Sequence, residues 1–127
     1  MRVLVVDDHE ASAKTMGWTI EIMGHDVRTA GNAEAAIAEA KSYRPHVVLM
    51  DISLPGMSGY DLCRAMQTDP EMKNTLFIAQ TGWNEAEHRR LSREAGFSHH
   101  LVKPVDMIRL EQLLVTHSAT VDEPGAN

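Results

Sequence analysis

Acidic, hydroxyl and amino side chains occur in this sequence at the ends of short apolar runs. Asp7 and Asp8 follow one such run, Asp51 ends a second, and Thr81 and Lys103 come at the ends of two more. Three carboxylates that lie close together repel one another unless a proton or a cation intervenes. Mg²⁺ suits carboxylate oxygens and fills its remaining positions with water, backbone oxygen or a phosphoryl group. A lysine and a hydroxyl opposite the carboxylates could bind further phosphoryl oxygens, so these residue types predict metal-assisted phosphoryl chemistry if one edge of the fold collects them.

The apolar runs have the pattern of strands that are buried on both faces of a sheet. The clearest run ends at Asp51, has four apolar residues without alternation, and lies between Pro45 and the turn at Pro55-Gly56. Continuous runs of this kind are typical of parallel sheets, which are covered on both faces. The predicted strands comprise residues 3–6, 26–30, 46–51, 76–80 and 100–102.

The segments between these runs have helical periodicity. In the first of them Ala13, Met16, Ile20 and Met23 recur at steps of three and four, and Gly24 follows as a stop signal. From residue 116 the sequence turns polar, so we expect residues 116–127 to form a disordered C-terminal tail. The predicted helices comprise residues 13–23, 33–40, 59–68, 85–95 and 107–114, with Asn32, Ser58 and Asp106 as caps of the second, third and fifth.

Strands that alternate with helices predict an α/β domain over residues 1–115. Such alternation implies a doubly wound parallel sheet with right-handed crossovers and helices on both faces. At this size the flavodoxin-like (βα)5 arrangement, with five strands in the order 2-1-3-4-5, is the leading prediction. The carboxyl ends of parallel strands share one edge, so this fold would bring the five polar side chains together.

Composition narrows the classes of function. The chain has 127 residues and a formal charge of −6, which disfavours direct binding to nucleic acid. We expect a cytoplasmic protein without a membrane segment, because no apolar run is long enough to span a bilayer and the single cysteine, Cys63, agrees with a reducing compartment. The basic residues of 88–90 and Arg93 predict a solvated helix face or a contact surface for another protein.

Each site residue also has a structural interpretation. Asp7 or Asp8 alone could cap a helix, Thr81 could be a strand-end hydroxyl, and Lys103 could be an ordinary surface charge. Their shared edge favours the functional interpretation. The seven histidines have no metal-ligand spacing, and His99-His100 would point to opposite faces of a strand.

Taken together, these features resemble the receiver domain of two-component response regulators over nearly the whole chain, to about Leu114. One motif alone would be a weak signal, whereas all of them in this order at strand ends form a specific set. The matching features are Asp7-Asp8, Asp51 within Leu-Met-Asp-Ile, the loop of residues 54–59, Thr81-Gly82 and Lys103-Pro104.

The resemblance implies a signalling switch that catalyses only its own phosphorylation and dephosphorylation. A sensor histidine kinase or a histidine phosphotransfer protein would donate a phosphoryl group to Asp51. Mg²⁺, or Mn²⁺, would be held by Asp8, Asp51 and the backbone carbonyl of Ser53, while Asp7 would act largely through bound water. These assignments come from the family and not from the spacing of the residues.

The resemblance also implies how the signal leaves the site. Lys103 would pair with Asp51 and later with a phosphoryl oxygen, and Thr81 would move to bind the phosphoryl group. That movement would alter the face formed by the fourth helix, the fifth strand and the fifth helix, so that the protein binds an unknown target, relays phosphate or forms a phosphorylation-dependent dimer. The family further implies a cis bond between Lys103 and Pro104.

Two positions depart from the common pattern or add to it. His100 stands where many receivers carry Tyr or Phe, and it is either a half-buried strand residue or a switch whose charge varies near neutral pH. Trp83 lies beside the expected phosphorylation site, where it would shield the acyl phosphate or anchor a partner. If it shields, Trp83→Ala should speed the loss of phosphate from Asp51.

Other functions fit the residues less well. A Mg²⁺-dependent phosphatase or phosphotransferase for small substrates usually needs a second acid two residues after the nucleophile, and that position holds Ser53. An FMN or nucleotide site would need a small-residue cradle, whereas the loop at residues 7–10 is acidic. Met1 directly before the first strand favours a free-standing protein over a receiver cut from a hybrid kinase.

Overall fold

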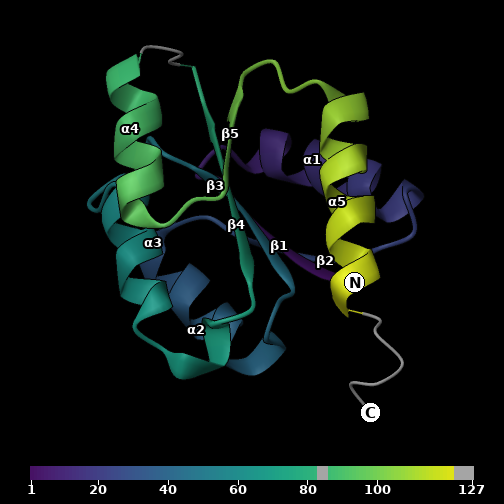
Figure 1. The fold of residues 1–127 in the computed structure, drawn as a ribbon, viewed down its shortest axis with the longest axis horizontal. Coiled ribbons are helices and arrows are strands. Elements are labelled where there is room, and N and C mark those ends of the chain that lie inside the picture. Colours follow the sequence, from purple (N-terminus) through teal and green to yellow (C-terminus); the bar gives the residue numbers. More distant parts are fainter. Residues whose placement is uncertain (83–85, 122–127) are drawn as a thin grey trace.

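Five parallel strands form the centre of the molecule in the computed structural model, which describes residues 1–82 and 86–121 (Figure 1). The strands are β1 (Arg2–Val6), β2 (Asp26–Ala30), β3 (Val47–Asp51), β4 (Leu76–Thr81) and β5 (His99–Val102). Their order across the sheet is β2-β1-β3-β4-β5, and each adjacent pair is parallel. The predicted α/β class and strand order are therefore confirmed.

Helices cover both faces of this sheet. They are α1 (Glu10–Ile22), α2 (Ala33–Tyr43), α3 (Gly59–Gln67), α4 (Ala86–Ala95) and α5 (Met107–Val121), with a short 3₁₀ helix, η1 (Pro70–Met72), before β4. Helices α1 and α5 lie on one face, and α2, α3 and α4 lie on the other (Figure 1). Within the described ranges, every helix is too short or too polar to cross a lipid bilayer.

Alternate residues of the central strands supply two separate apolar cores. Val3 and Val5 face α1 and α5, where they pack with residues such as Leu110, while Leu4 and Val6 face the other three helices. These four β1 side chains are fully buried, and only Arg2 at the start of the strand is partly exposed. Because successive side chains of a strand point to opposite faces, a continuous apolar run is what a sheet covered on both sides requires.

The helix starts follow local capping chemistry. The side chains of Asn32, Ser58 and Asp106 each accept hydrogen bonds from backbone amides of the first turn of their helices, as predicted. At α1 the cap is neither of the aspartates but His9, whose Nδ1 accepts a hydrogen bond from the Ser12 amide at 3.3 Å. The alternative role of Asp7 or Asp8 as the cap of this helix is therefore excluded.

Helix α5 is longer than predicted. The expectation of a disordered tail from residue 116 is wrong for residues 116–121, which continue the helix to Val121. Leu110 and Leu114 are buried, and His117 and Val121 follow at steps of three and four and are half-buried. These two residues extend the inward face of the helix although the segment is polar overall. The remainder of the predicted tail, residues 122–127, lies outside the described residues.

Candidate functional site

The carboxyl ends of four strands meet at one edge of the sheet. The pairing of the strands aligns the carboxyl ends of β1, β3, β4 and β5 at one level along one edge of the sheet, so the residues that follow these strands are neighbours. Hydrogen bonds reinforce this register, since the Lys103 amide donates to the Thr81 carbonyl at 2.8 Å. At that level the paired residues are Val6 with Met50, Asp51 with Gln80, and Thr81 with Val102.

Three carboxylates gather at this edge. Asp7, Asp8 and Asp51 each present an oxygen, and these oxygens all lie within 4.8 Å of one another. Asp7 and Asp51 are only 3% and 5% exposed, whereas Asp8 is exposed to solvent. The structure thus brings together the three acidic residues that the sequence singled out, although they come from two strands that are separated by a helix, a strand and a second helix.

Asp51 has a donor at each carboxylate oxygen. Its Oδ2 lies 2.7 Å from Nζ of Lys103, and its Oδ1 accepts a hydrogen bond from the backbone amide of Ser53 at 2.9 Å. The lysine side chain is 40% exposed, so it reaches the buried carboxylate from the open side of the edge. The ion pair offsets part of the cost of burying the Asp51 charge.

Asp7 lies deepest in the acidic cluster. Burial raises its pKa above the ordinary value for aspartate, and the nearby carboxylates of Asp51 and Asp8 raise the pKa further. A hydrogen bond from the His9 amide to Oδ1, at 2.9 Å, and the charge of Lys103 act in the opposite direction and lower it. The net increase in pKa means that burial outweighs these two contacts, so the site disfavours the ionised form of Asp7.

This donor set fits a hard divalent cation. All three side chains offer carboxylate oxygen, which Mg²⁺ and Mn²⁺ prefer, and Asp8 remains accessible from solvent. The backbone of Ser53 lies against Asp51, as its amide hydrogen bond shows. The expected ligand residues are therefore neighbours in the structure, and their role toward a metal remains a prediction.

Thr81 ends β4 and is 1% exposed. It lies one residue beyond Gln80, which pairs with Asp51 in the sheet, so the two expected functional residues come from adjacent strand ends. The Lys103-Pro104 peptide bond is cis, as the family resemblance implies.

The structure describes one of the two positions that depart from the family pattern or add to it, His100, and not the other, Trp83. His100 is half-buried on β5, and its Nδ1 lies 2.8 Å from Oγ of Ser92 on α4. This contact ties the strand to the helix, and a switching role for His100 stays a prediction. Trp83 lies outside the described residues. His99 does not share the contact of His100, and among residues 1–82 and 86–121 the only group of three or more candidate ligands is the aspartate cluster.

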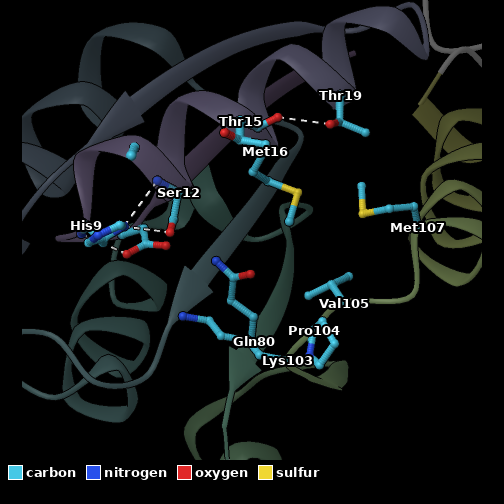
Figure 2. Close-up of a pocket in the computed structure, with 12 residues that line it drawn as sticks. His9, Ser12, Thr15, Met16, Thr19, Gln80, Lys103, Pro104, Val105 and Met107 are labelled. Atoms are coloured by element: carbon cyan, nitrogen blue, oxygen red, sulfur yellow. Dashed lines mark hydrogen bonds between the residues drawn. The ribbon is translucent and has the colours of Figure 1, made fainter.

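A pocket of about 490 Å³ opens beside the acidic edge, between α1 and the segment that joins β5 to α5 (Figure 2). Asp7 and Lys103 form part of its wall. Met16 from α1 and Met107 from α5 point toward one another across it (Figure 2). The site is therefore bordered on one side by a largely apolar surface.

Sequence reasoning missed the contributions of His9 and of this pocket. His9 caps α1 through its side chain and holds the Asp7 carboxylate through its backbone amide. Histidine is not among the preferred capping residues, so no local signal predicted it. The pocket walls come from segments nearly ninety positions apart in the chain, and only the packing of α1 beside α5 creates it.

Comparison with known proteins agrees with this geometry. The response regulator receiver domain model matches residues 3–115. The chain is 32% identical over 109 residues to "Response regulator PleD" of Caulobacter vibrioides, covering 86% of this chain and 24% of that protein. It is also 32% identical over 117 residues to "Signal transduction histidine-protein kinase BarA" of Escherichia coli, covering 92% of this chain and 13% of that protein.

The fold is likewise shared with solved receivers. The chemotaxis protein CheY4 of Vibrio cholerae superposes with a TM-score of 0.85 at 27% identity, covering 91% of this chain and 96% of that one. The present chain spans a quarter or less of the length of the two curated relatives named above, so the likeness concerns one module of those proteins. The match of the family model over nearly the whole chain, on a sheet whose edge carries the acidic cluster and its lysine, shows that this chain belongs to the family of response regulator receiver domains.

Proposed function

We propose that this receiver is a phosphorylation-dependent signalling switch with Asp51 as the phosphoryl acceptor. The observation that carries the proposal is the position of Asp51, which is nearly buried, ends the central strand, and lies between two further carboxylates and the ammonium group of Lys103. A carboxylate in this setting is held in place as a nucleophile, and of the three carboxylates only Asp51 is paired with the lysine.

The proposed step transfers a phosphoryl group from a phosphohistidine. A carboxylate oxygen of Asp51 forms a bond to phosphorus as the phosphorus–nitrogen bond breaks, and the electron pair returns to the imidazole of the donor, which takes up a proton. Such transfer depends mainly on positioning and on neutralising the charge of the phosphoryl oxygens. Lys103, already 2.7 Å from Asp51, would follow a phosphoryl oxygen, and the Thr81 hydroxyl would donate a hydrogen bond to another.

Asp8, Asp51 and the backbone carbonyl of Ser53 would hold Mg²⁺ or Mn²⁺, with Asp7 acting through water. A bound divalent cation would neutralise the negative charge that builds up on the phosphoryl oxygens. The protein's own contribution is to keep the three carboxylates within 4.8 Å despite their repulsion, through the amide hydrogen bonds from His9 and Ser53.

We further propose that the chemistry of this protein is confined to its own aspartate. An enzyme that turns over small phosphorylated substrates with an aspartate nucleophile would need a second acid two residues after it, and that position holds Ser53, whose backbone amide donates to Asp51. The partners would be a histidine kinase or histidine phosphotransfer protein as donor, and a downstream protein as target. Location in the cytoplasm accords with such partners.

Intact mass spectrometry tests the proposal directly. The full chain is incubated with acetyl phosphate or phosphoramidate and Mg²⁺, beside a chelated sample and the variants Asp51→Asn and Asp61→Asn. Asp61 is an exposed aspartate on α3 and serves as the matched control. We expect one phosphoryl group on the parent protein and on Asp61→Asn, and none on Asp51→Asn or after chelation.

Two results would contradict the proposal. Modification that persists in Asp51→Asn would place the acceptor elsewhere, and a folded protein that binds Mg²⁺ but is modified neither by small phosphodonors nor by a phosphohistidine protein would not be a phosphoryl acceptor. Phosphate released continuously from acetyl phosphate, without label on the protein, would instead favour a phosphatase.

A further inference from the structure

The pocket between α1 and the segment that joins β5 to α5 has the size and lining of a small-molecule site. Its volume of about 490 Å³ lies within the range of about 300–1,000 Å³ that is common for ligand pockets. Met16, Val105 and Met107 supply much of its apolar wall (Figure 2). The function proposed above uses Asp7 and Lys103 at one side of the pocket and leaves the rest of it without a role.

Gln80 points into this pocket from β4 (Figure 2). Ile78, two residues earlier in the strand, packs in the core beneath α1 and α5. Because alternate residues of a strand point to the same face, Gln80 is directed toward the same two helices. Its partner across the sheet is Asp51, so the carboxamide lies beside the expected phosphoryl acceptor but belongs to the pocket.

The carboxamide of Gln80 is buried and has no partner in the protein. Gln80 is 2% exposed. Its backbone carbonyl accepts a hydrogen bond from the Ile52 amide at 3.1 Å, whereas its side chain forms none with residues 1–82 or 86–121. A carboxamide offers two donors and an acceptor, and buried polar groups are nearly always hydrogen-bonded. An unpartnered carboxamide that faces a pocket therefore points to a ligand that supplies the missing partners.

Two other polar side chains of the wall are already engaged within α1. Oγ of Ser12 lies 2.7 Å from Nδ1 of His9, and the Thr19 hydroxyl donates to the Thr15 carbonyl at 2.9 Å. Both contacts lie inside the wall of the pocket (Figure 2). Gln80 is therefore the buried side chain whose hydrogen-bonding groups remain available to recognise a ligand.

The charges of the wall favour an uncharged ligand. Asp7 and Lys103, the lining residues with a formal charge, have opposite signs. Lys103 is paired with Asp51 at 2.7 Å and so provides no unpaired counter-charge for an anion. A charged group that entered the apolar part of the pocket would lose its hydration without gaining an ion pair, which is costly.

The two methionines favour a flat aromatic ligand. Met16 and Met107 come from different helices and point toward one another across the pocket (Figure 2). The thioether sulfur makes favourable contacts with aromatic rings, and the unbranched side chain adapts to their shape. A ring held by these side chains would present its edge to the carboxamide of Gln80.

We propose that this pocket binds a small, uncharged aromatic lactam, in which a ring N–H donor lies beside a C=O acceptor. The N–H of the ligand would donate to the carboxamide oxygen of Gln80, and the C=O of the ligand would accept from the carboxamide nitrogen. Met16 and Met107 would enclose the ring. The proposal concerns binding alone and does not depend on phosphorylation of Asp51.

The bicyclic lactam carbostyril is the probe, and its N-methyl derivative is the matched control, because methylation removes the N–H and keeps the ring and the carbonyl. Each is titrated into the ¹⁵N-labelled whole chain and followed by NMR. We expect carbostyril to shift the amides of residues 11–19 and 105–107 and the side-chain amide of Gln80, with a Kd of about 0.1–1 mM for a ligand of this size. The N-methyl derivative should bind about five- to tenfold more weakly, because it leaves the carboxamide oxygen unpaired.

Three variants locate the binding. Gln80→Met removes the carboxamide at similar volume and should bind both probes with equal affinity. Gln112→Met changes an exposed glutamine of α5 outside the pocket and should keep the difference between the probes. Met16→Ala should weaken both probes alike, by about two- to tenfold, because it removes a contact with the ring and none with its edge. Amide spectra report whether each variant is folded.

Equal affinity of the two probes for the parent protein, or a difference that persists in Gln80→Met, would overturn the proposal. Shifts centred elsewhere on the chain, or the absence of saturable shifts, would overturn it as well. Intact mass of the same samples after treatment with acetyl phosphate separates this proposal from the previous one. Phosphorylated Asp51 without probe binding removes only the lactam site, and probe binding without phosphorylation removes only the proposed switch.

Discussion

Asp51 is held by donors of two kinds, a mobile ammonium group and a fixed backbone amide. Lys103 is 40% exposed and reaches Oδ2 through a flexible chain, whereas the Ser53 amide is fixed by the loop that follows β3. If Asp51 accepts a phosphoryl group, as proposed, the lysine can move with that group while the amide keeps the carboxylate in position. A fixed carboxylate with one movable counter-charge would suit repeated gain and loss of a phosphoryl group.

Removing the charge of Asp7 should stabilise the fold when no metal is present. Its pKa is raised in the folded state, mainly by burial, so its ionised form lowers stability. We expect Asp7→Asn to have a higher urea midpoint at neutral pH, since asparagine keeps the oxygen that accepts the His9 hydrogen bond. The folded state binds more protons than the unfolded one between the two pKa values, so the advantage should shrink as pH falls through that window.

Glu111→Gln is the matched control, because Glu111 is an exposed carboxylate on α5 away from the cluster. The prediction fails if the urea midpoint of Asp7→Asn equals or falls below that of the parent protein while Glu111→Gln leaves the midpoint unchanged. The charge of Asp7 would then not destabilise the fold.

His100 should respond to events at Asp51 if it is a switch residue. Its contact with Ser92 at 2.8 Å would break or shorten as α4 and β5 rearrange. We expect the imidazole resonances of His100 to shift when beryllofluoride, which mimics a phosphoryl group, is added with Mg²⁺. His25, whose Nδ1 lies 3.2 Å from the N-terminal amine at the far edge of the sheet, should not shift. If the imidazole resonances of His100 and His25 shift equally or not at all, His100 is not a switch residue.

At the scale of elements, the start of α3 is packed directly on the chain that leaves β3. The Gly59 amide donates to the Ile52 carbonyl at 2.9 Å. A Cβ atom at Gly59 would lie 2.7 Å from Cα of Ile52 and 2.8 Å from the carbonyl oxygen of Asp51, which are distances that backbone atoms cannot accommodate. The absence of a side chain at Gly59 therefore sets how closely α3 approaches Asp51.

Gly59→Ala should displace this helix and disturb the site. We expect a loss of about 2 kcal/mol in the free energy of unfolding, the usual scale for overpacking, and slower labelling of Asp51 by acetyl phosphate. Gly31→Ala is the control, because a Cβ there meets no atom within 4 Å. Urea denaturation and labelling rates compare the two variants, and similar results for both would show that the close approach at Gly59 is not needed.

At the scale of the whole molecule, the acidic cluster joins both cores. Asp7 continues β1 and Asp51 ends β3, and alternate residues of these strands pack on opposite faces of the sheet. A cation that binds both carboxylates should therefore stabilise the entire fold. At a hundredfold excess over its Kd, a ligand that binds only the folded state adds about 2.7 kcal/mol.

We expect Mg²⁺ to raise the thermal midpoint in a saturable manner and EDTA to reverse the increase. Asp8→Asn removes an exposed carboxylate of the cluster and should abolish most of this shift while leaving the metal-free protein folded. Glu111→Gln should keep the whole shift. An increase that Asp8→Asn retains would place the metal elsewhere.

Local patterns predicted most of this architecture. Most strand positions followed from continuous apolar runs, and β2, which has a weaker pattern, begins and ends at the predicted residues. The helix caps at Asn32, Ser58 and Asp106 followed from the preference of short polar side chains for the first turn. The predicted end of α5 was wrong because the last part of the helix is polar in composition. Only the packing of the helix against the sheet shows that His117 and Val121 are half-buried.

The sequence by itself determined which residues form the site, because strand-end positions and side-chain types are properties of short segments. Asp7, Asp8, Asp51, Thr81 and Lys103 could all be named before any contact was known. Only the tertiary structure decided the geometry in which they meet: the 2.7 Å contact between Lys103 and Asp51, whose pairing the family resemblance had implied, and the support of Asp7 by the His9 amide. These features depend on the sheet register and on helix packing, which join segments far apart in the chain and therefore leave no local signal.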